Sequence, residues 1–62
     1  SLRQQLMAQR SLAQLYRQAA DCASAQIAYR QAITTARFLN DEREEAFLLN
    51  QLSSLQFEIL SR

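Results

Sequence analysis

The most restrictive feature of this sequence is an absence: its 62 residues contain neither glycine nor proline. The tight turns that join β-strands depend heavily on these two residues. The most frequent residues instead, Ala, Leu, Gln and Arg, favour helix. We therefore predict an all-α fold. A chain of this length forms at most one small domain, with marginal stability of its own.

Three antiparallel helices are predicted from apolar residues that recur at spacings of three and four. Their expected ranges are about 2–19, 22–39 and 42–60. Both connections are then only two or three residues long, which makes consecutive helices antiparallel neighbours.

The residues at the two connections carry helix start and stop signals. Asp21 is expected to cap the second helix through its carboxylate, with Ser24 as an alternative cap. Asn40 tolerates the left-handed conformation that closes a helix. Asp41 followed by Glu44 resembles a capping box, so the third helix is expected to begin after Asp41.

Each helix has an expected apolar face. On the first helix it contains Leu2, Leu6, Leu12, Leu15, Tyr16 and Ala19; on the second, Cys22, Ala25, Tyr29, Ala32, Ile33 and Ala36; and on the third, Leu48, Leu49, Leu52, Leu55, Ile59 and Leu60. In addition, Phe47 and Phe57 lie around the third helix from its leucines, so its apolar arc is too wide for one neighbour. We expect this helix to pack against another copy, a neighbouring repeat or a partner chain, through residues from the set Phe47, Leu48, Leu52, Leu55 and Ile59.

Small and aromatic residues alternate regularly on the first two helices, and this pattern resembles the tetratricopeptide repeat (TPR) family. The positions that carry the resemblance are Leu12, Ala13 and Tyr16 on the first helix and Ala25, Tyr29 and Ala32 on the second, with Asp21 in the turn. The sequence departs from the family in having Ala20 at the turn glycine, Cys22 at the aromatic after the aspartate, and no proline after the second helix.

A shift of 40 residues extends the resemblance into the third helix. It places Leu52 on Leu12, Ser53 on Ala13 and Leu55 on Leu15, while Gln56 takes the tyrosine position. The resemblance then covers residues 6 to 60, as one repeat of the longer type and half of another. Because the chain opens on Ser1 without a methionine, we expect 1–62 to be a single TPR-like unit from a longer protein.

The resemblance also implies a binding surface, because in TPR proteins the first helix of each repeat lines a concave peptide groove. The matching positions here are Met7, Arg10, Gln14 and Arg17, and on the third helix Phe47, Asn50, Ser54 and Phe57. From these we predict the partner-binding residues Arg10, Gln14, Arg17, Phe47, Asn50 and Phe57. Arginine forks bind carboxylates and amide groups bind peptide backbone, which suits an acidic or extended peptide. The other interpretation of the arginine row, which also includes Arg3, is a solvated helix face.

The sequence lacks most of the residue types that catalytic and metal sites use. It has no histidine, and its single Cys22 has neither a candidate base nor a second metal-binding Cys or His, so no enzyme, metal site or cofactor is expected. A net charge of +1 and tyrosines on the expected core faces argue against nucleic acid. No apolar run could span a bilayer, and one cysteine gives no support to an oxidising compartment, so a cytoplasmic protein is expected.

The function expected from the sequence is therefore protein–protein interaction, as a TPR-like scaffold or a peptide-binding groove. The alternative is a self-associating three-helix module, in which the apolar third helix drives assembly of a homo-oligomer. The sequence does not name the partner.

Overall fold

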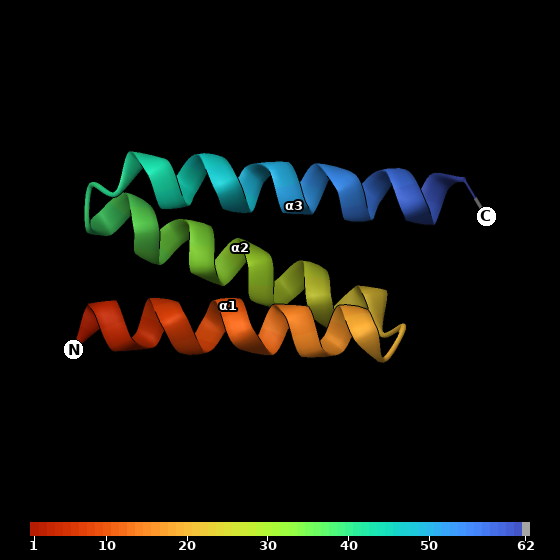
Figure 1. Ribbon diagram of the computed structural model, residues 1–62, viewed down its shortest axis with the longest axis horizontal. Helices are drawn as coiled ribbons and strands as arrows, with labels where there is room; N and C mark the ends of the chain where they lie inside the picture. Colours follow the sequence, from red (N-terminus) through yellow and green to blue (C-terminus); the bar gives the residue numbers. More distant parts are fainter. Residues whose placement is uncertain (62) are drawn as a thin grey trace.

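A computed structural model describes residues 1–61, so the last residue of the expected 1–62 unit lies outside the described part. The described residues form three α-helices: α1 (Leu2–Gln18), α2 (Cys22–Phe38) and α3 (Glu42–Leu60). This confirms the predicted all-α fold, with helix ends within one residue of those expected. The helices alternate in direction and lie side by side in one layer, with α2 between α1 and α3 (Figure 1). The Cα atoms span 36 × 18 × 12 Å.

The two connections have the same backbone structure, which explains how helices end without glycine. Ala20 and Asn40 adopt positive φ angles of 61° and 56°. Directly after them, the amide of Asp21 donates to the Tyr16 carbonyl at 2.9 Å, and the amide of Asp41 donates to the Ala36 carbonyl at 2.9 Å. These bonds reach back five residues to close the last turn of the helix, the arrangement of a Schellman motif.

The positive φ at Ala20 leads to a first expected result. Ala20→Gly should stabilise the protein by about 0.5–1 kcal/mol. A left-handed alanine costs roughly 1–2 kcal/mol, and glycine avoids this cost but loses more conformational entropy than alanine when the chain folds. The matched control is Asn40→Gly, which should gain less because asparagine tolerates this conformation. Thermal unfolding measures both. Equal midpoints for Ala20→Gly and the wild type would contradict the strain at Ala20.

The same aspartates that end one helix start the next. The Asp21 carboxylate accepts from the amide of Ser24 at 3.2 Å, so Asp21 caps α2 and Ser24 does not. The Asp41 carboxylate accepts from the amide of Glu44 at 3.1 Å. The expected reciprocal bond from the Asp41 amide to the Glu44 carboxylate is absent, since this amide donates to the Ala36 carbonyl and the Glu44 carboxylate accepts from Arg10.

A reciprocal capping box does occur, at the start of α1. The Ser1 hydroxyl accepts from the amide of Gln4 at 3.2 Å, and the Gln4 side chain accepts from the nitrogen of Ser1 at 3.3 Å. The sequence patterns described above did not predict this cap.

The hydrophobic core runs along the centre of the layer and is supplied mainly by α2. Its largest fully buried side chains are Leu6, Tyr29, Leu48 and Leu55. The other buried apolar residues are Ala13, Ala25, Ala28, Ala32, Ile33 and Ala36. Five of these six smaller residues are alanines, which lets the helix axes approach closely while Tyr29 and the leucines fill the space between them. The predicted burial of Tyr29 and Ala32 is confirmed, since both are 0% exposed.

The predicted apolar face of α1 is wrong in part. Leu12 is 44% exposed and Leu15 is 60% exposed, whereas Leu6 and Ala13 are fully buried. The face that meets α2 therefore follows Leu6 and Ala13, and Tyr16 packs at its border. The positions of the leucines do not show which side of α1 is buried, because Leu12 and Leu15 form a second apolar stripe. No helix of the described chain covers this stripe.

The apolar residues predicted to bind outside partners through α3 are also partly wrong. Leu48 and Leu55 are fully buried, and Leu52 and Ile59 pack against the same core at the α2 side. In contrast, Leu49 and Leu60, assigned above to the buried face, are exposed. Most of the α3 residues that were expected to bind another chain thus pack against α2 instead. The exposed apolar residues of α3 lie on a different side of this helix.

Candidate protein-binding surfaces

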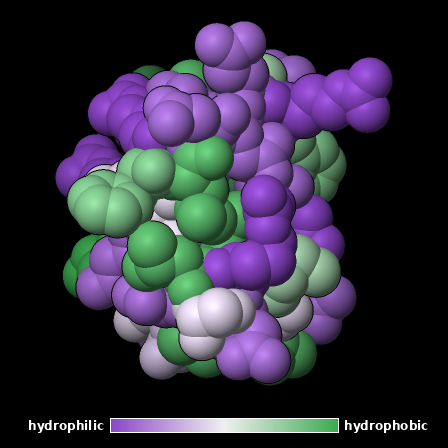
Figure 2. All heavy atoms as spheres, turned by 90° about the vertical axis from the view of Figure 1, so that its left-hand side faces the viewer, coloured by the Kyte–Doolittle hydropathy of each residue, from purple (hydrophilic) through white to green (hydrophobic). Residues whose placement is uncertain are grey.

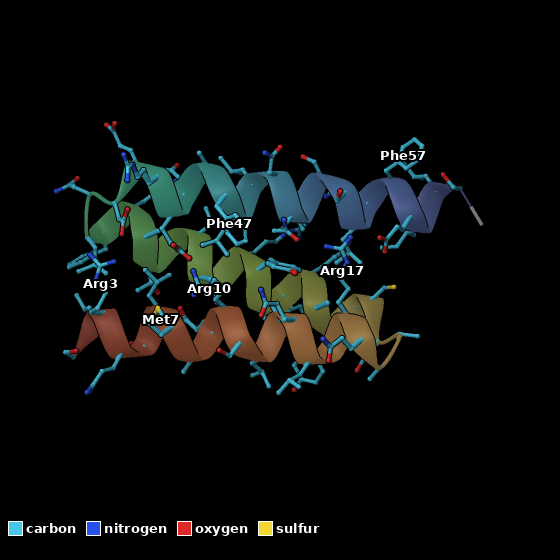
Figure 3. All side chains as sticks on the ribbon, viewed as in Figure 1. Arg3, Met7, Arg10, Arg17, Phe47 and Phe57 are labelled. Atoms are coloured by element: carbon cyan, nitrogen blue, oxygen red, sulfur yellow. The ribbon has the colours of Figure 1, made fainter. Side chains whose placement is uncertain are left out.

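The predicted arginine row of α1 reaches across to α3. Arg3, Arg10 and Arg17 recur every seven residues, and each donates to a side chain of α3 or of its cap (Figure 3). We call this surface, formed by α1 and α3 where the arginines connect them, the bridged face.

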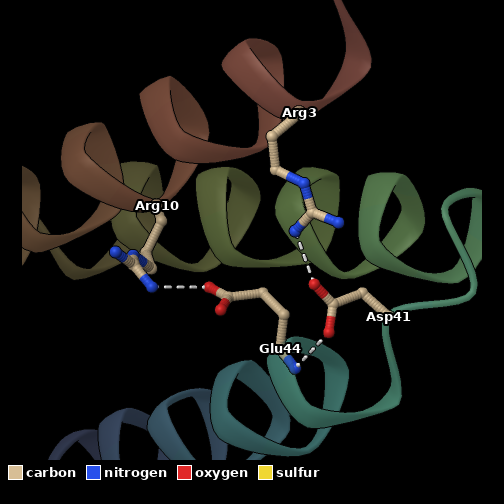
Figure 4. Close-up of polar contacts among 4 residues, drawn as sticks. All are labelled: Arg3, Arg10, Asp41 and Glu44. Atoms are coloured by element: carbon tan, nitrogen blue, oxygen red, sulfur yellow. Dashed lines mark hydrogen bonds and ion pairs between the residues drawn. The ribbon is translucent and has the colours of Figure 1, made fainter.

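At its N-terminal end the bridged face holds two ion pairs. Arg3 binds the Asp41 carboxylate, and Arg10 binds the Glu44 carboxylate at 2.8 Å. Figure 4 shows both arginines extending from α1 across α2, which passes behind them, to the start of α3. Because Asp41 also caps α3, one carboxylate both starts this helix and ties it to α1.

At the other end, Arg17 makes two contacts. Its guanidinium donates to Gln51 at 3.1 Å and to Glu58 at 2.6 Å. The hydrogen bond that Arg17 donates to the Glu58 carboxylate is the main cause that raises the pKa of Arg17, and the nearby Tyr29 hydroxyl contributes less. That hydroxyl is buried and has no hydrogen-bond partner within residues 1–61. Arg17 therefore supplies positive charge beside a buried, unpaired phenol oxygen.

The residues that accept hydrogen bonds from the arginines were not predicted, although their spacing in the sequence is a signal for them. Glu44, Gln51 and Glu58 are also spaced by seven. Seven residues are close to two full turns of a helix, so such a row stays near one face over the roughly four turns that it spans. Two such rows, one basic and one of acid and amide groups, indicate helices that lie side by side and pair through them.

The remaining predicted partner-binding residues fall into different environments. Phe47 is 41% exposed, and the Arg10 guanidinium lies 5.9 Å from its ring centroid, within range of a cation–π interaction. Gln14 and Asn50 are exposed. Phe57 is 72% exposed and points away from α1 and α2 in Figure 3. The structure thus brings Arg10 and Phe47 together, and it separates Phe57 from them.

The ion pair of Arg3 with Asp41 gives the protein an expected pH dependence. Arg3, and next the amide of Glu44, hold the pKa of Asp41 below its ordinary value of 3.8. A lowered folded-state pKa stabilises the fold at pH values above the unfolded-state pKa, and this contribution is lost as the pH falls through the folded-state pKa. Asp41→Asn keeps a good helix cap but removes the charge, so its thermal midpoint should fall less than that of the wild type between about pH 6 and pH 2.

The control for this pH dependence is Arg3→Gln. It removes the main cause of the lowered Asp41 pKa, so the folded-state and unfolded-state pKa values of Asp41 come closer together and the thermal midpoint should fall less than that of the wild type over this pH range, though more than that of Asp41→Asn. Identical pH profiles for the wild type and Asp41→Asn would show that Asp41 makes no such contribution.

A second surface lies on the outer side of the α1–α2 pair. A shallow hollow there is lined by Leu12, Tyr16, Ser24, Ile27, Ala28 and Gln31. Ile27 is 59% exposed and Leu12 is open to solvent beside it. This outer α1–α2 face is the uncovered second stripe of α1 together with the neighbouring side of α2.

Further apolar side chains are exposed at one end of the layer and along α3. Figure 2 shows apolar atoms gathered at the end where α1 and α3 begin and α2 finishes. Phe38, in the last turn of α2, is 76% exposed. On α3 the exposed apolar side chains include Leu49, Phe57 and Leu60. Exposed large apolar residues that gather in patches are typical of interaction sites.

Chemical sites of other kinds receive no support from the described residues. Within residues 1–61 no three His, Cys, Asp or Glu side chains are grouped so that they could hold a metal ion. None of the helices in that range is long and apolar enough to cross a membrane. No protein-family model, curated protein or solved structure matches this chain.

Proposed function

We propose that this chain is a protein–protein interaction module, a TPR-like helical scaffold that binds other proteins or peptides. The observation that carries the proposal is a pair of separate exposed apolar surfaces. One is the outer α1–α2 face around Leu12 and Ile27, and the other is the side of α3 with Leu49, Phe57 and Leu60. A chain of this size depends strongly on its buried apolar area, so two exposed apolar surfaces are typical of a protein that binds partners through them.

The TPR-like part of the proposal is supported by the positions that carry the resemblance. Ala13, Ala25, Tyr29 and Ala32 all lie in the core, and Tyr16 packs at its edge. Of the six helical positions only Leu12 is exposed, and Asp21 in the turn is exposed as well. The small and aromatic residues thus make the close contact between α1 and α2 that such a helix pair requires.

The bridged face is the candidate peptide-binding surface of this module. Its positive charge is already matched, because Glu44 and Glu58 accept from Arg10 and Arg17. An acidic peptide must therefore displace these carboxylates from the arginines, which weakens its net gain. Exposed Gln14 and the partly exposed Phe47 remain open to the backbone and the apolar side chains of an extended peptide.

Two charge variants test this binding with a matched pair of extended peptides, one Glu-rich and one with Gln at the same positions. Glu44→Gln with Glu58→Gln frees both arginines, so the Glu-rich peptide should bind several-fold more tightly than it binds the wild type. Arg10→Ala with Arg17→Ala should weaken that peptide about tenfold at low salt and less at high salt, because salt screens exposed charges. Titration calorimetry measures all four combinations.

The Gln peptide serves as the control, since it should respond little to either change. If neither double variant alters the affinity for the Glu-rich peptide, the arginines only connect α1 to α3, and peptide binding at the bridged face is wrong.

The alternative function is self-association, and the exposed side of α3 favours it. If a second copy covers Leu49, Phe57 and Leu60, the protein assembles as a homo-oligomer. Sedimentation of the isolated chain separates the two functions, because a monomer at all concentrations would exclude assembly.

Three further expectations belong to this proposal. The module acts without catalysis and without a cofactor, which is supported by the absence of histidine from the sequence. Nucleic acid is not a partner, since the basic row of α1 is paired with groups on α3. A cytoplasmic location is supported by Cys22, the single cysteine, which has no partner for an internal disulfide.

A further inference from the structure

We propose that α3 pairs with α3 of a second copy, antiparallel and two-fold symmetric about Ser53. The contact is made by the outer stripe of α3, which consists of Ala46, Leu49, Ser53, Phe57 and Leu60. This inference rests on the proposed function, since it names the partner for one of the two exposed apolar surfaces of the interaction module.

The outer stripe is a continuous and accessible surface. Its residues are spaced by 3, 4, 4 and 3, the pattern that keeps side chains on one side of a helix. All five are exposed, with Leu49 at 41%, Phe57 at 72% and Leu60 at 86%. The opposite side of α3, with Leu48 and Leu55, is buried against α2. The stripe therefore faces outward from the edge of the layer, as the position of Phe57 in Figure 3 illustrates.

Side-chain size makes this stripe complementary to itself. In an antiparallel pair centred on Ser53, residues equally far from the centre share a layer. Ala46 then meets Leu60 of the second copy, and Leu49 meets Phe57 of the second copy. Ser53 meets its own equivalent, and two small residues at the centre let the helix axes come close. The chain packs its own helices in a similar way, with alanines such as Ala32 beside larger side chains in the core.

The uncovered stripe of α1 does not have this property, although its spacing is also symmetric. Any stripe with helical spacing can be paired with itself, so the residue types decide. On α1 the pairing would place Ala8 against Ala19 and Leu12 against Leu15. That leaves a gap at the small pair and crowding at the large pair, both of which cost packing energy. Self-pairing is therefore favoured at α3 over α1.

The length of α3 sets the expected strength of the pair. A helix of 19 residues is about 28 Å long, and a contact about 10 Å wide offers on the order of 300 Å² on each copy. Stable interfaces bury about 800 Å² on each partner. The dimer should therefore be weak, with a dissociation constant on the order of 0.1–1 mM, and sedimentation should show dimers only toward the upper end of about 10 µM to 1 mM.

Cysteine cross-linking tests the register, in a Cys22→Ala background that removes the native thiol. Ser53→Cys should form an intermolecular disulfide under mild oxidation, because equivalent positions meet at the centre of the pair. The matched control is Ser54→Cys, which is also exposed but turned by about 100° around the helix, and it should form at least about tenfold less dimer. Circular dichroism checks that both variants keep their helices.

A second pair of variants tests the direction. Leu49→Cys alone should cross-link poorly, because two copies of position 49 lie about 12 Å apart along an antiparallel pair. Mixed with Phe57→Cys it should give the mixed dimer. Efficient cross-linking of Leu49→Cys alone would indicate parallel helices and overturn the proposal, as would equal yields for Ser53→Cys and Ser54→Cys. A chain that stays monomeric up to about 1 mM would also overturn it.

The outcome for α3 can be told apart from the outcome for the module as a whole. A monomer that still binds the peptides described above would remove the α3 pairing and leave the proposed function intact. A dimer that binds no peptide would support the pairing and reject peptide binding at the bridged face.

Discussion

Leu55→Ala is expected to lower the free energy of unfolding by about 2–5 kcal/mol, the largest effect of any single change considered for this protein. Leu55 is fully buried, and it lies on the face of α3 that packs against α2. Its removal leaves a cavity at a contact that holds the third helix in place. Since a core of this size supplies only about 3–5 kcal/mol in total, the variant should be largely unfolded at room temperature. Urea unfolding followed by far-UV circular dichroism measures the loss.

The control for this prediction is Leu60→Ala on the same helix. Leu60 is 86% exposed, so its truncation should change the stability of the monomer by no more than about 0.5 kcal/mol. The comparison is made at low concentration, where association through the outer stripe adds nothing. Similar losses for the two variants would mean that α3 is not docked through the Leu55 face.

Ala32→Leu should destabilise the protein by about 1–3 kcal/mol through overpacking. Ala32 is 0% exposed on the central helix, among the alanines that allow close contact between helices. A leucine there must push neighbouring side chains out of their preferred rotamers or separate the helices. For a domain of this size, a loss of this kind lowers the thermal midpoint by about 4–8 °C per kcal/mol.

Thr34→Leu is the matched control, because Thr34 is exposed and lies two residues further along α2. The added volume there enters solvent, and leucine has the higher helix propensity, so the variant should be neutral or slightly stabilised. An Ala32→Leu protein that melts with the wild type would show that the helices do not pack through Ala32.

Ala32 and Leu55 show which features of the core could be predicted from the sequence. Ala32 was correctly predicted to lie between helices, because its small size fits the spacing of Tyr29 and the other alanines. Leu55 was placed correctly on an apolar face but assigned to an outside partner as well. The spacing of apolar residues identifies a stripe, and it does not say which neighbour covers that stripe.

On the bridged face too, the sequence predicted the positions along one helix and did not predict the contacts between helices. Arg10 and Arg17 were predicted to share one face of α1, and the structure has them on one face. Their contacts with Glu44 and Glu58 were not predicted, since these residues lie 34 and 41 positions away in the sequence. The pairing depends on how α1 and α3 are placed against α2, and it changes the expected character of the face from an open basic row to a charge-matched one.

The sequence by itself determined the three helices, their ends and their caps. Asp21 and Asp41 cap helices through amides three residues away, and Asn40 closes α2 in the left-handed conformation. These interactions connect neighbours along the chain, so their energies are set by the local sequence whatever the rest of the protein does.

Only the tertiary structure decided which apolar stripe each helix buries. On α1 both the Leu6–Ala13 stripe and the Leu12–Leu15 stripe are apolar, and α2 covers the first. On α3 it covers Leu48 and Leu55 and leaves Leu49 and Phe57 open. Burial of apolar area has no direction of its own, so two stripes of similar area are nearly equivalent until a neighbouring helix packs against one of them. That choice depends on the fit of side chains from distant parts of the chain, which no local pattern contains.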